Sequence, residues 1–154
     1  MSKTLIAYAS RSGATEQAAH MILEVLKDKY GLEVDLVNLR KDSPNLAQYE
    51  NIIIGSGVRA GKVYREALSF LKQDFGNRKI AFFVSCGGAG DPRNYESSCT
   101  KYITEVLARY PNVKVVATEA FGDHWKIFGK TIFNNVDPAK IRAWAETLGN
   151  KLAE

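Results

Sequence analysis

A segment of small polar residues, SRSGAT at positions 10–15, lies between an apolar run and a stretch with helical periodicity. Its three hydroxyl residues can donate hydrogen bonds, and Gly13 permits a tight loop. At the start of a helix the backbone N–H groups lack partners, and the helix dipole adds partial positive charge. Together these features suit the binding of a phosphate group, because small residues let the anion approach closely. The alternative is an ordinary helix start that is capped by Ser12.

Two more loops of small residues follow apolar runs further along the chain. They are GSGVRAGK at residues 55–62 and SCGGAGDPRNY at residues 85–95. In an open α/β sheet, ligands bind beyond the carboxyl ends of the strands, at the point where the strand order reverses. Three loops of this kind, each at the end of a strand, therefore predict one shared ligand site.

The hydrophobic pattern predicts the elements that would hold these loops in place. Strands that alternate with helices predict a parallel sheet, and nearly continuous apolar strands fit a sheet that is covered on both faces. We therefore predict an α/β fold, a doubly wound five-stranded parallel sheet with helices on both faces, in a single domain over residues 1–154. The predicted strands are 4–9, 32–39, 51–57, 79–86 and 113–120, and the predicted helices are 15–30, 66–75, 95–110 and 138–152.

Several kinds of phosphate site are excluded by the sequence. The chain has no G-x-x-x-x-G-K-[ST] motif, which excludes a P-loop NTPase, and no G-x-G-x-x-G follows the first predicted strand, which excludes a dinucleotide fingerprint. Residues 10–15 contain no cysteine, so a cysteine-dependent phosphatase loop is also excluded. A response-regulator receiver needs acidic residues where this chain has Ala9-Ser10 and Gly55-Ser56.

Composition narrows the classes of function further. Cys86 and Cys99 have the spacing of neither a disulfide framework nor a metal motif, and His20 and His124 have no second ligand nearby in sequence, so no metal site is expected. The net charge of +4 comes from scattered residues, and we expect no nucleic-acid partner. The apolar runs are too short to cross a bilayer and the N-terminal segment lacks a secretory pattern, so we expect a cytoplasmic protein.

The segment Ser10–Thr15 resembles the phosphate loop of flavodoxins, [ST]-x-[ST]-G-x-[ST], and it occupies the same place between the first strand and the first helix. The resemblance covers essentially the whole chain. In its second loop the chain is most similar to the flavodoxin-like protoporphyrinogen oxidases, whose S-x-R-x-G pattern matches Ser56, Arg59 and Gly61. By these motifs the sequence is identified as resembling the flavodoxin family.

This resemblance implies that FMN binds non-covalently, with its phosphate on the first loop and its isoalloxazine ring between the second and third loops. A peptide group at Gly57 or Gly61, beside flavin N5, would be the redox-linked switch. The resemblance implies no catalytic residue and the following cofactor-binding residues: Ser10, Arg11, Ser12, Gly13, Ala14 and Thr15; Ser56, Gly57, Val58, Arg59, Ala60 and Gly61; Ser85, Cys86, Gly87, Gly88, Gly90, Asp91 and Tyr95.

The chain departs from the flavodoxin pattern in being basic and in having no aromatic residue in its second loop. Tyr95 in the third loop is one aromatic candidate for the ring, and Trp125 could reach the ring or simply pack on the domain. Cys86 could touch the flavin or be a buried thiol. Asp91 could accept a hydrogen bond from the ring N3–H or cap a turn.

The segment Phe121–Phe133 is unusually aromatic and also contains lysines. Exposed apolar patches tend to be contact sites, so one interpretation is contact with a membrane, a quinone or a partner protein. The alternative is a short helix that folds back onto the domain.

Three functions follow from these observations. The leading prediction is an FMN electron carrier, a flavodoxin, that shuttles electrons between redox partner proteins, since the cofactor supplies the chemistry and no acid–base pair is needed. The alternative is an enzyme, a flavin-dependent oxidase or dehydrogenase resembling protoporphyrinogen oxidase or a quinone-linked reductase. The third is an interaction module that binds no flavin.

Overall fold

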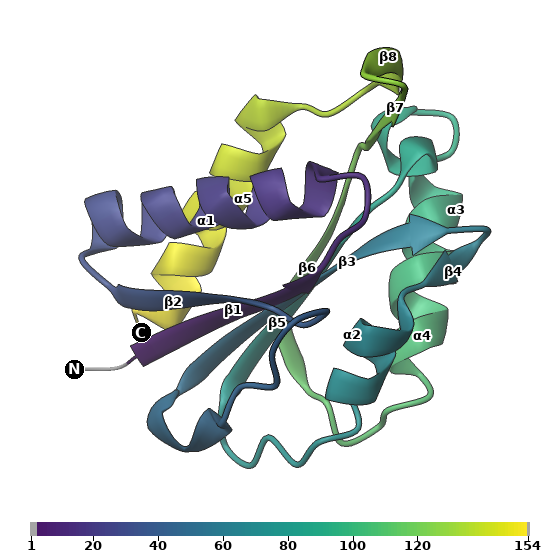
Figure 1. The fold of residues 1–154 in the computed structure, drawn as a ribbon. Coiled ribbons are helices and arrows are strands. Elements are labelled where there is room, and N and C mark those ends of the chain that lie inside the picture. Colours follow the sequence, from purple (N-terminus) through teal and green to yellow (C-terminus); the bar gives the residue numbers. More distant parts are fainter. Residues whose placement is uncertain (1–2, 154) are drawn as a thin grey trace.

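A parallel sheet of five strands forms the centre of the fold in the computed structural model, which describes residues 3–153 (Figure 1). The strand order is β2-β1-β3-β5-β6, so the direction of winding reverses between β1 and β3. The predicted fold class is confirmed, while residues 1, 2 and 154 of the predicted domain lie outside the described residues. The strands are β1 (Lys3–Ala9), β2 (Glu33–Asn38), β3 (Asn51–Arg59), β5 (Lys79–Ser85) and β6 (Val115–Phe121).

Helices cover both faces of the sheet, and this explains the continuous apolar strands. Along β1, Leu5 and Ala7 join the core on one face, whereas Ile6 and Tyr8 join the core on the other. Figure 1 shows α1 and α5 together on one face and the remaining helices opposite. The helices are α1 (Ala14–Tyr30), α2 (Arg65–Phe70), α3 (Tyr95–Cys99), the π-helix η3 (Thr100–Thr104), α4 (Glu105–Leu107) and α5 (Pro138–Leu152), with 3₁₀ turns η1 (Leu46–Gln48) and η2 (Gly87–Gly90).

The second helix is shorter than its hydrophobic pattern predicts. It ends at Phe70, whereas the pattern predicts a helix to residue 75. Phe70 and Phe75 are both buried, and their ring centroids lie 5.8 Å apart. Residues five apart point about 140° away from each other around a helix axis, so the chain must leave the helix for these two rings to meet.

The second loop is a β-hairpin and not an open loop. β3 continues two residues beyond its predicted end, to Arg59, and turns back into the short antiparallel strand β4 (Lys62–Val63). The two turn residues, Ala60 and Gly61, have φ values of 53° and 74°, as in the tight turns that suit the twist of a hairpin.

A second hairpin replaces the short helix that was the alternative for residues 121–133. β7 (His124–Ile127) pairs antiparallel with β8 (Lys130–Asn134) in a separate two-stranded sheet. This β7–β8 hairpin stands at the edge of the fold, above the carboxyl ends of the central strands (Figure 1). Within residues 3–153, no helix combines the length and apolar character that a bilayer crossing requires.

Candidate functional site

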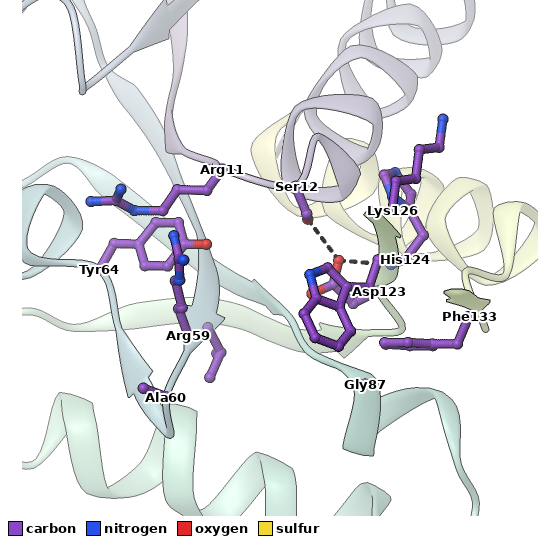
Figure 2. Close-up of a pocket in the computed structure, with 12 residues that line it drawn as sticks. Arg11, Ser12, Arg59, Ala60, Tyr64, Gly87, Asp123, His124, Lys126 and Phe133 are labelled. Carbon is purple, nitrogen blue, oxygen red and sulfur yellow. Dashed lines mark hydrogen bonds between the residues drawn. The ribbon is translucent and has the colours of Figure 1, made fainter. Parts of the chain in front are cut away.

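A cavity of about 560 Å³ opens at the carboxyl edge of the sheet, where the winding reverses (Figure 2). Ligand sites of open α/β sheets occur at this place. Three structural units form its walls: the loop after β1, the β3–β4 hairpin and the β7–β8 hairpin, with one residue from the loop after β5. The lining residues are Arg11, Ser12, Val58, Arg59, Ala60, Tyr64, Gly87, Asp123, His124, Trp125, Lys126 and Phe133.

The first loop leaves the start of α1 open toward this edge. Gly13 is the N-cap residue, with φ 94° and ψ −11°, and no side chain caps the helix. The Gly13 N–H donates to Ser10 Oγ over 3.1 Å, while the Ser12 hydroxyl donates to Asp123 Oδ1 over 2.9 Å. Ser12 Oγ lies 3.5 Å from the Ala14 nitrogen, which is long for a hydrogen bond, so Ser12 is not a strong cap. The structure thus supports the anion-site interpretation of this loop over the capping interpretation.

Aromatic lining comes from Tyr64, which is not among the predicted binding residues. Tyr64 follows the β3–β4 hairpin, and its N–H donates to Ser56 Oγ over 3.2 Å. Its ring lies beside Gly57 and under the Arg11 guanidinium, with 5.3 Å from Arg11 Cζ to the ring centroid. Burial, with a smaller contribution from the charge of Asp123, raises the pKa of Tyr64. The hydroxyl therefore stays protonated at neutral pH, and the ring forms a rigid wall of the cavity.

Trp125 and Phe133 also supply aromatic lining, and Figure 2 shows Phe133 on the side of the cavity opposite Tyr64. They pair across the β7–β8 hairpin, and the Phe133 ring lies so close to Gly87 that a Cβ there would be 3.1 Å away. Tyr95, the third-loop candidate, lies instead in a neighbouring cavity of about 480 Å³. Its hydroxyl donates to Glu119, and Lys140 Nζ lies 4.0 Å from its ring centroid.

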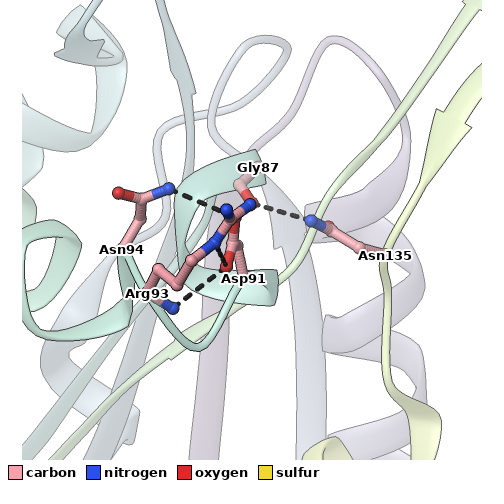
Figure 3. Close-up of polar contacts among 5 residues, drawn as sticks. All are labelled: Gly87, Asp91, Arg93, Asn94 and Asn135. Carbon is pink, nitrogen blue, oxygen red and sulfur yellow. Dashed lines mark hydrogen bonds and ion pairs between the residues drawn. The ribbon is translucent and has the colours of Figure 1, made fainter.

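The third loop turns most of its predicted residues away from the main cavity. Ser85 and Cys86 are buried, and burial raises the pKa of the Cys86 thiol, which supports the interpretation of a buried thiol. Asp91 accepts hydrogen bonds from the Arg93 backbone and guanidinium and from the Asn94 amide, as Figure 3 shows. These bonds from Arg93 hold the pKa of Asp91 below its ordinary value, and the carboxylate stabilises the turn.

A single amide holds this loop against the base of the β7–β8 hairpin. Asn135 Nδ2 donates to the Gly87 carbonyl over 2.7 Å (Figure 3), and the Asp123 N–H donates to Asn135 Oδ1 over 2.9 Å. A Cβ on Gly90 or Gly122 would lie within 2.2 Å of Asn135 atoms. Close contact with Asn135 therefore requires glycine at both positions.

Asp123, which is not among the predicted binding residues, brings a carboxylate to the first loop. Its Oδ1 accepts hydrogen bonds from the Ser12 hydroxyl and from the His124 N–H, the latter over 2.8 Å. Burial raises the pKa of Asp123, and these hydrogen bonds offset part of that rise. The His124 ring lies beside Gly13, and its Nδ1 is buried without a hydrogen-bond partner among the described residues. Asp123 and His124 lie next to the first loop because the chain forms a hairpin after β6. The sequence could have predicted their position only if that hairpin had been predicted.

The structure thus brings together part of the predicted set of binding residues. The predicted residues that line the cavity are Arg11, Ser12, Val58, Arg59, Ala60 and Gly87. Ser10, Gly13, Ala14 and Thr15 share the first loop or the first turn of α1, and Ser56, Gly57 and Gly61 belong to the β3–β4 hairpin. Ser85, Cys86, Gly88, Gly90, Asp91 and Tyr95 do not line it.

The sequence matches the flavodoxin domain family over residues 5–136. It is 33% identical over 93 residues to the probable flavodoxin 1 of Bacillus subtilis (strain 168), a match that covers 59% of this chain and 58% of that protein. It is 29% identical over 72 residues to the protoporphyrinogen IX dehydrogenase (quinone) of Escherichia coli (strain K12), covering 46% of this chain and 39% of that protein. Both matches span less than two thirds of the relative's length.

The fold is also similar to that of solved flavodoxins. Oxidised flavodoxin 2 from Bacillus cereus superposes with a TM-score of 0.68 and 27% sequence identity, over 97% of this chain and 99% of that one. The family match covers most of the chain, and the sheet has the strand order of a flavodoxin-like fold. The chain therefore belongs to the flavodoxin family.

Proposed function

We propose that this protein is an electron carrier that binds FMN in the cavity at the carboxyl edge of the sheet. The observation that carries the proposal is the uncapped N-terminus of α1, with Gly13 in a left-handed conformation, at the rim of a cavity with aromatic walls. FMN is the cofactor that membership of the flavodoxin family supports, and one solved flavodoxin of this fold is bound to it. When bound, FMN supplies one-electron transfer, and the protein supplies binding and electrostatics.

Each wall of the cavity has a separate task in this proposal. The first loop would hold the phosphate through backbone N–H groups and the hydroxyls of Ser10 and Thr15, while the Ser12 hydroxyl donates to Asp123. The His124 ring lies beside Gly13, with Nε2 4.0 Å from the position of an added Cβ, so a ring nitrogen is available near the loop that would hold the phosphate. Tyr64 and Trp125 would shield the faces of the ring, in place of the aromatic residue that the second loop lacks.

A second candidate is a flavin-dependent dehydrogenase that passes electrons to a quinone. The Ser56, Arg59 and Gly61 pattern supports it, together with the similarity to the dehydrogenase of Escherichia coli. The match covers only part of both chains. An interaction module without flavin is the least supported candidate, because the open helix start and the aromatic walls would then have no ligand.

The direct test is to add FMN to the purified protein, remove free flavin on a desalting column and record the visible spectrum. We expect flavin bands that stay with the protein and that bleach in two separate one-electron steps under anaerobic reduction. Turnover of a porphyrinogen or a quinone by the loaded protein would favour the enzyme. Failure to retain FMN at saturating concentration would overturn the proposal in favour of the interaction module.

Replacing Asp123 with asparagine should tighten FMN binding by about tenfold or more. Two unit charges that lie about 8 Å apart interact by about 2 kcal/mol at an effective dielectric constant near 20, so a carboxylate at the first loop would oppose each charge of a bound phosphate on this scale. An asparagine carbonyl can still accept the hydrogen bonds from Ser12 and His124. Titration of flavin fluorescence measures the effect, and riboflavin is the control because it lacks the phosphate. Equal gains for FMN and riboflavin would contradict this explanation.

The same substitution should change how stability depends on pH. Because burial raises the Asp123 pKa in the folded state, its stability contribution is complete below the unfolded pKa of about 3.9 and is lost as pH rises through the folded value. Urea unfolding should therefore show that Asp123→Asn is the more stable protein at pH 7 and that the difference disappears near pH 4. A difference independent of pH would contradict the assignment.

Replacing Arg59 with glutamine should make the second one-electron couple more negative by roughly 40–90 mV. Arg59 lines the cavity, and a unit positive charge near a reduced flavin contributes on the order of 1–2 kcal/mol, which converts at 59 mV per tenfold. Lys62→Gln is the matched control: Lys62 pairs with Arg59 across the hairpin but does not line the cavity. Anaerobic redox titration should show a smaller shift for the control, and equal shifts would contradict the prediction.

A further inference from the structure

The β7–β8 hairpin concentrates apolar side chains that the fold leaves uncovered. All the exposed large hydrophobic side chains among the described residues lie on it, and it stands clear of the helices in Figure 1. Water-soluble monomers rarely expose an apolar group of this kind unless it contacts something. The side chains and their exposed fractions are Trp125 (54%), Ile127 (41%), Phe128 (101%), Ile132 (54%) and Phe133 (38%).

Two independent features of the hairpin tip are energetically unfavourable: its backbone conformation and the exposure of its phenylalanine. Phe128 has φ 50° and Gly129 has φ 80°, so both turn residues are left-handed. Such turns favour Asn-Gly, and a left-handed conformation costs an ordinary L-residue roughly 1–2 kcal/mol. The Phe128 side chain is also completely exposed, so no contact within the chain offsets this cost. An apolar environment outside the chain would offset it.

The charges on the hairpin indicate which apolar environment this is. Lys126 and Lys130 are exposed behind the tip, and residues 124–136 contain no carboxylate. Asp123, at the base, is engaged by Ser12. An apolar tip with cations behind it matches the interface of an anionic bilayer, where lysine stems cross the apolar zone and their ammonium groups reach the headgroups.

We propose that the β7–β8 hairpin inserts Phe128 and its apolar neighbours into the headgroup region of a membrane that contains anionic lipids. The side chains of Ile127, Phe128 and Ile132 do not line the cavity, so this contact does not require bound FMN, and it can fail or succeed independently of the proposed function. An acidic protein with an apolar groove is the competing occupant, and the experiment below separates the two.

Co-sedimentation with lipid vesicles tests the proposal. We expect the protein to bind phosphatidylcholine vesicles that contain phosphatidylglycerol and to bind vesicles of pure phosphatidylcholine much more weakly. Phe128→Asn should reduce binding about tenfold while keeping the hairpin folded, because Asn-Gly is the preferred sequence for this turn. Lys126→Gln with Lys130→Gln should reduce binding roughly fivefold per lysine and remove the preference for anionic lipid.

A control variant separates hairpin contact from general electrostatic attraction. Lys72→Gln with Lys114→Gln removes the same charge near the opposite edge of the sheet, where these lysines border a different cavity. This control should bind vesicles like the original protein. Absence of binding to the anionic vesicles, or an equal loss in the control and hairpin variants, would overturn the proposal. Retention by an acidic protein column that Phe128→Asn abolishes, without any vesicle binding, would identify a protein as the occupant instead.

Discussion

Gly13→Ala should weaken FMN binding by at least about 100-fold while the protein stays folded. Gly13 begins α1 with φ 94°, a conformation in which alanine is strained by roughly 1–2 kcal/mol. Alanine would relieve that strain by rotating the peptide groups of the loop, and the N–H groups proposed to hold the phosphate would no longer converge. A 100-fold loss corresponds to about 2.7 kcal/mol, which is the scale of one or two hydrogen bonds to a charged group.

The other end of the same helix provides a matched control. Gly31 follows α1 with φ 62°, and no atom lies within 4 Å of the position that a Cβ would take there. Gly31→Ala should therefore impose a similar backbone strain, far from the cavity, and leave FMN affinity unchanged. Fluorescence titration and thermal unfolding of both variants make the comparison. If Gly13→Ala bound FMN like the original protein, or Gly31→Ala lost as much affinity, the phosphate assignment would be wrong.

Gly55→Ala should cost about 3 kcal/mol or more in the free energy of unfolding, the largest effect on stability that we predict. A Cβ at this position on β3 would lie 2.2 Å from Phe83 Cζ and within 2.8 Å of two more ring atoms. The Phe83 ring has little room to move, because its centroid is 5.7 Å from that of Phe121 and 5.9 Å from that of Trp144. Overpacking a rigid core costs about 1–3 kcal/mol and occasionally more.

A double substitution separates this clash from a general defect of the strand. Phe83→Leu alone leaves a cavity and should destabilise the protein, yet it removes the atoms that the new methyl group would meet. The double variant Gly55→Ala with Phe83→Leu should then be more stable than the sum of the single effects predicts, by about 1–3 kcal/mol. Urea unfolding of the four proteins gives this coupling free energy, and additive effects would refute the steric explanation.

Most of the fold could be predicted because each of its core strands and helices has one clear hydrophobic pattern. The apolar runs of β1, β3 and β5 and the helical periodicity of α1 and α5 persist over enough residues to identify the element. The two hairpins could not be predicted, because β4 has two residues and β7 has four. Their turns also begin with Ala60 and Phe128, residue types that seldom adopt a positive φ.

The location of the site could be predicted more accurately than its lining. The end of each strand places a loop at the carboxyl edge, so the first and second loops were expected there, and they do border the cavity. The direction in which each loop side chain points is harder to predict than the position of the loop. Ser56 turns inward to accept the Tyr64 N–H, and Asp91 is engaged by its own turn. Tyr64 and Asp123 reach the cavity only because the chain doubles back in a hairpin.

The amide of Asn135 has a consequence for how this protein can vary in sequence. Because its two ends bond Gly87 and Asp123, a change in length at the base of the β7–β8 hairpin would displace a wall of the cavity. Among the described residues, Phe128 at the tip is fully exposed and no atom lies near the position of a Cβ on Gly129, so residues can be inserted there at little cost to the fold. Relatives with longer segments at this point should carry them at the tip, so the surface proposed to contact a membrane can vary in sequence while the walls of the cavity keep their positions.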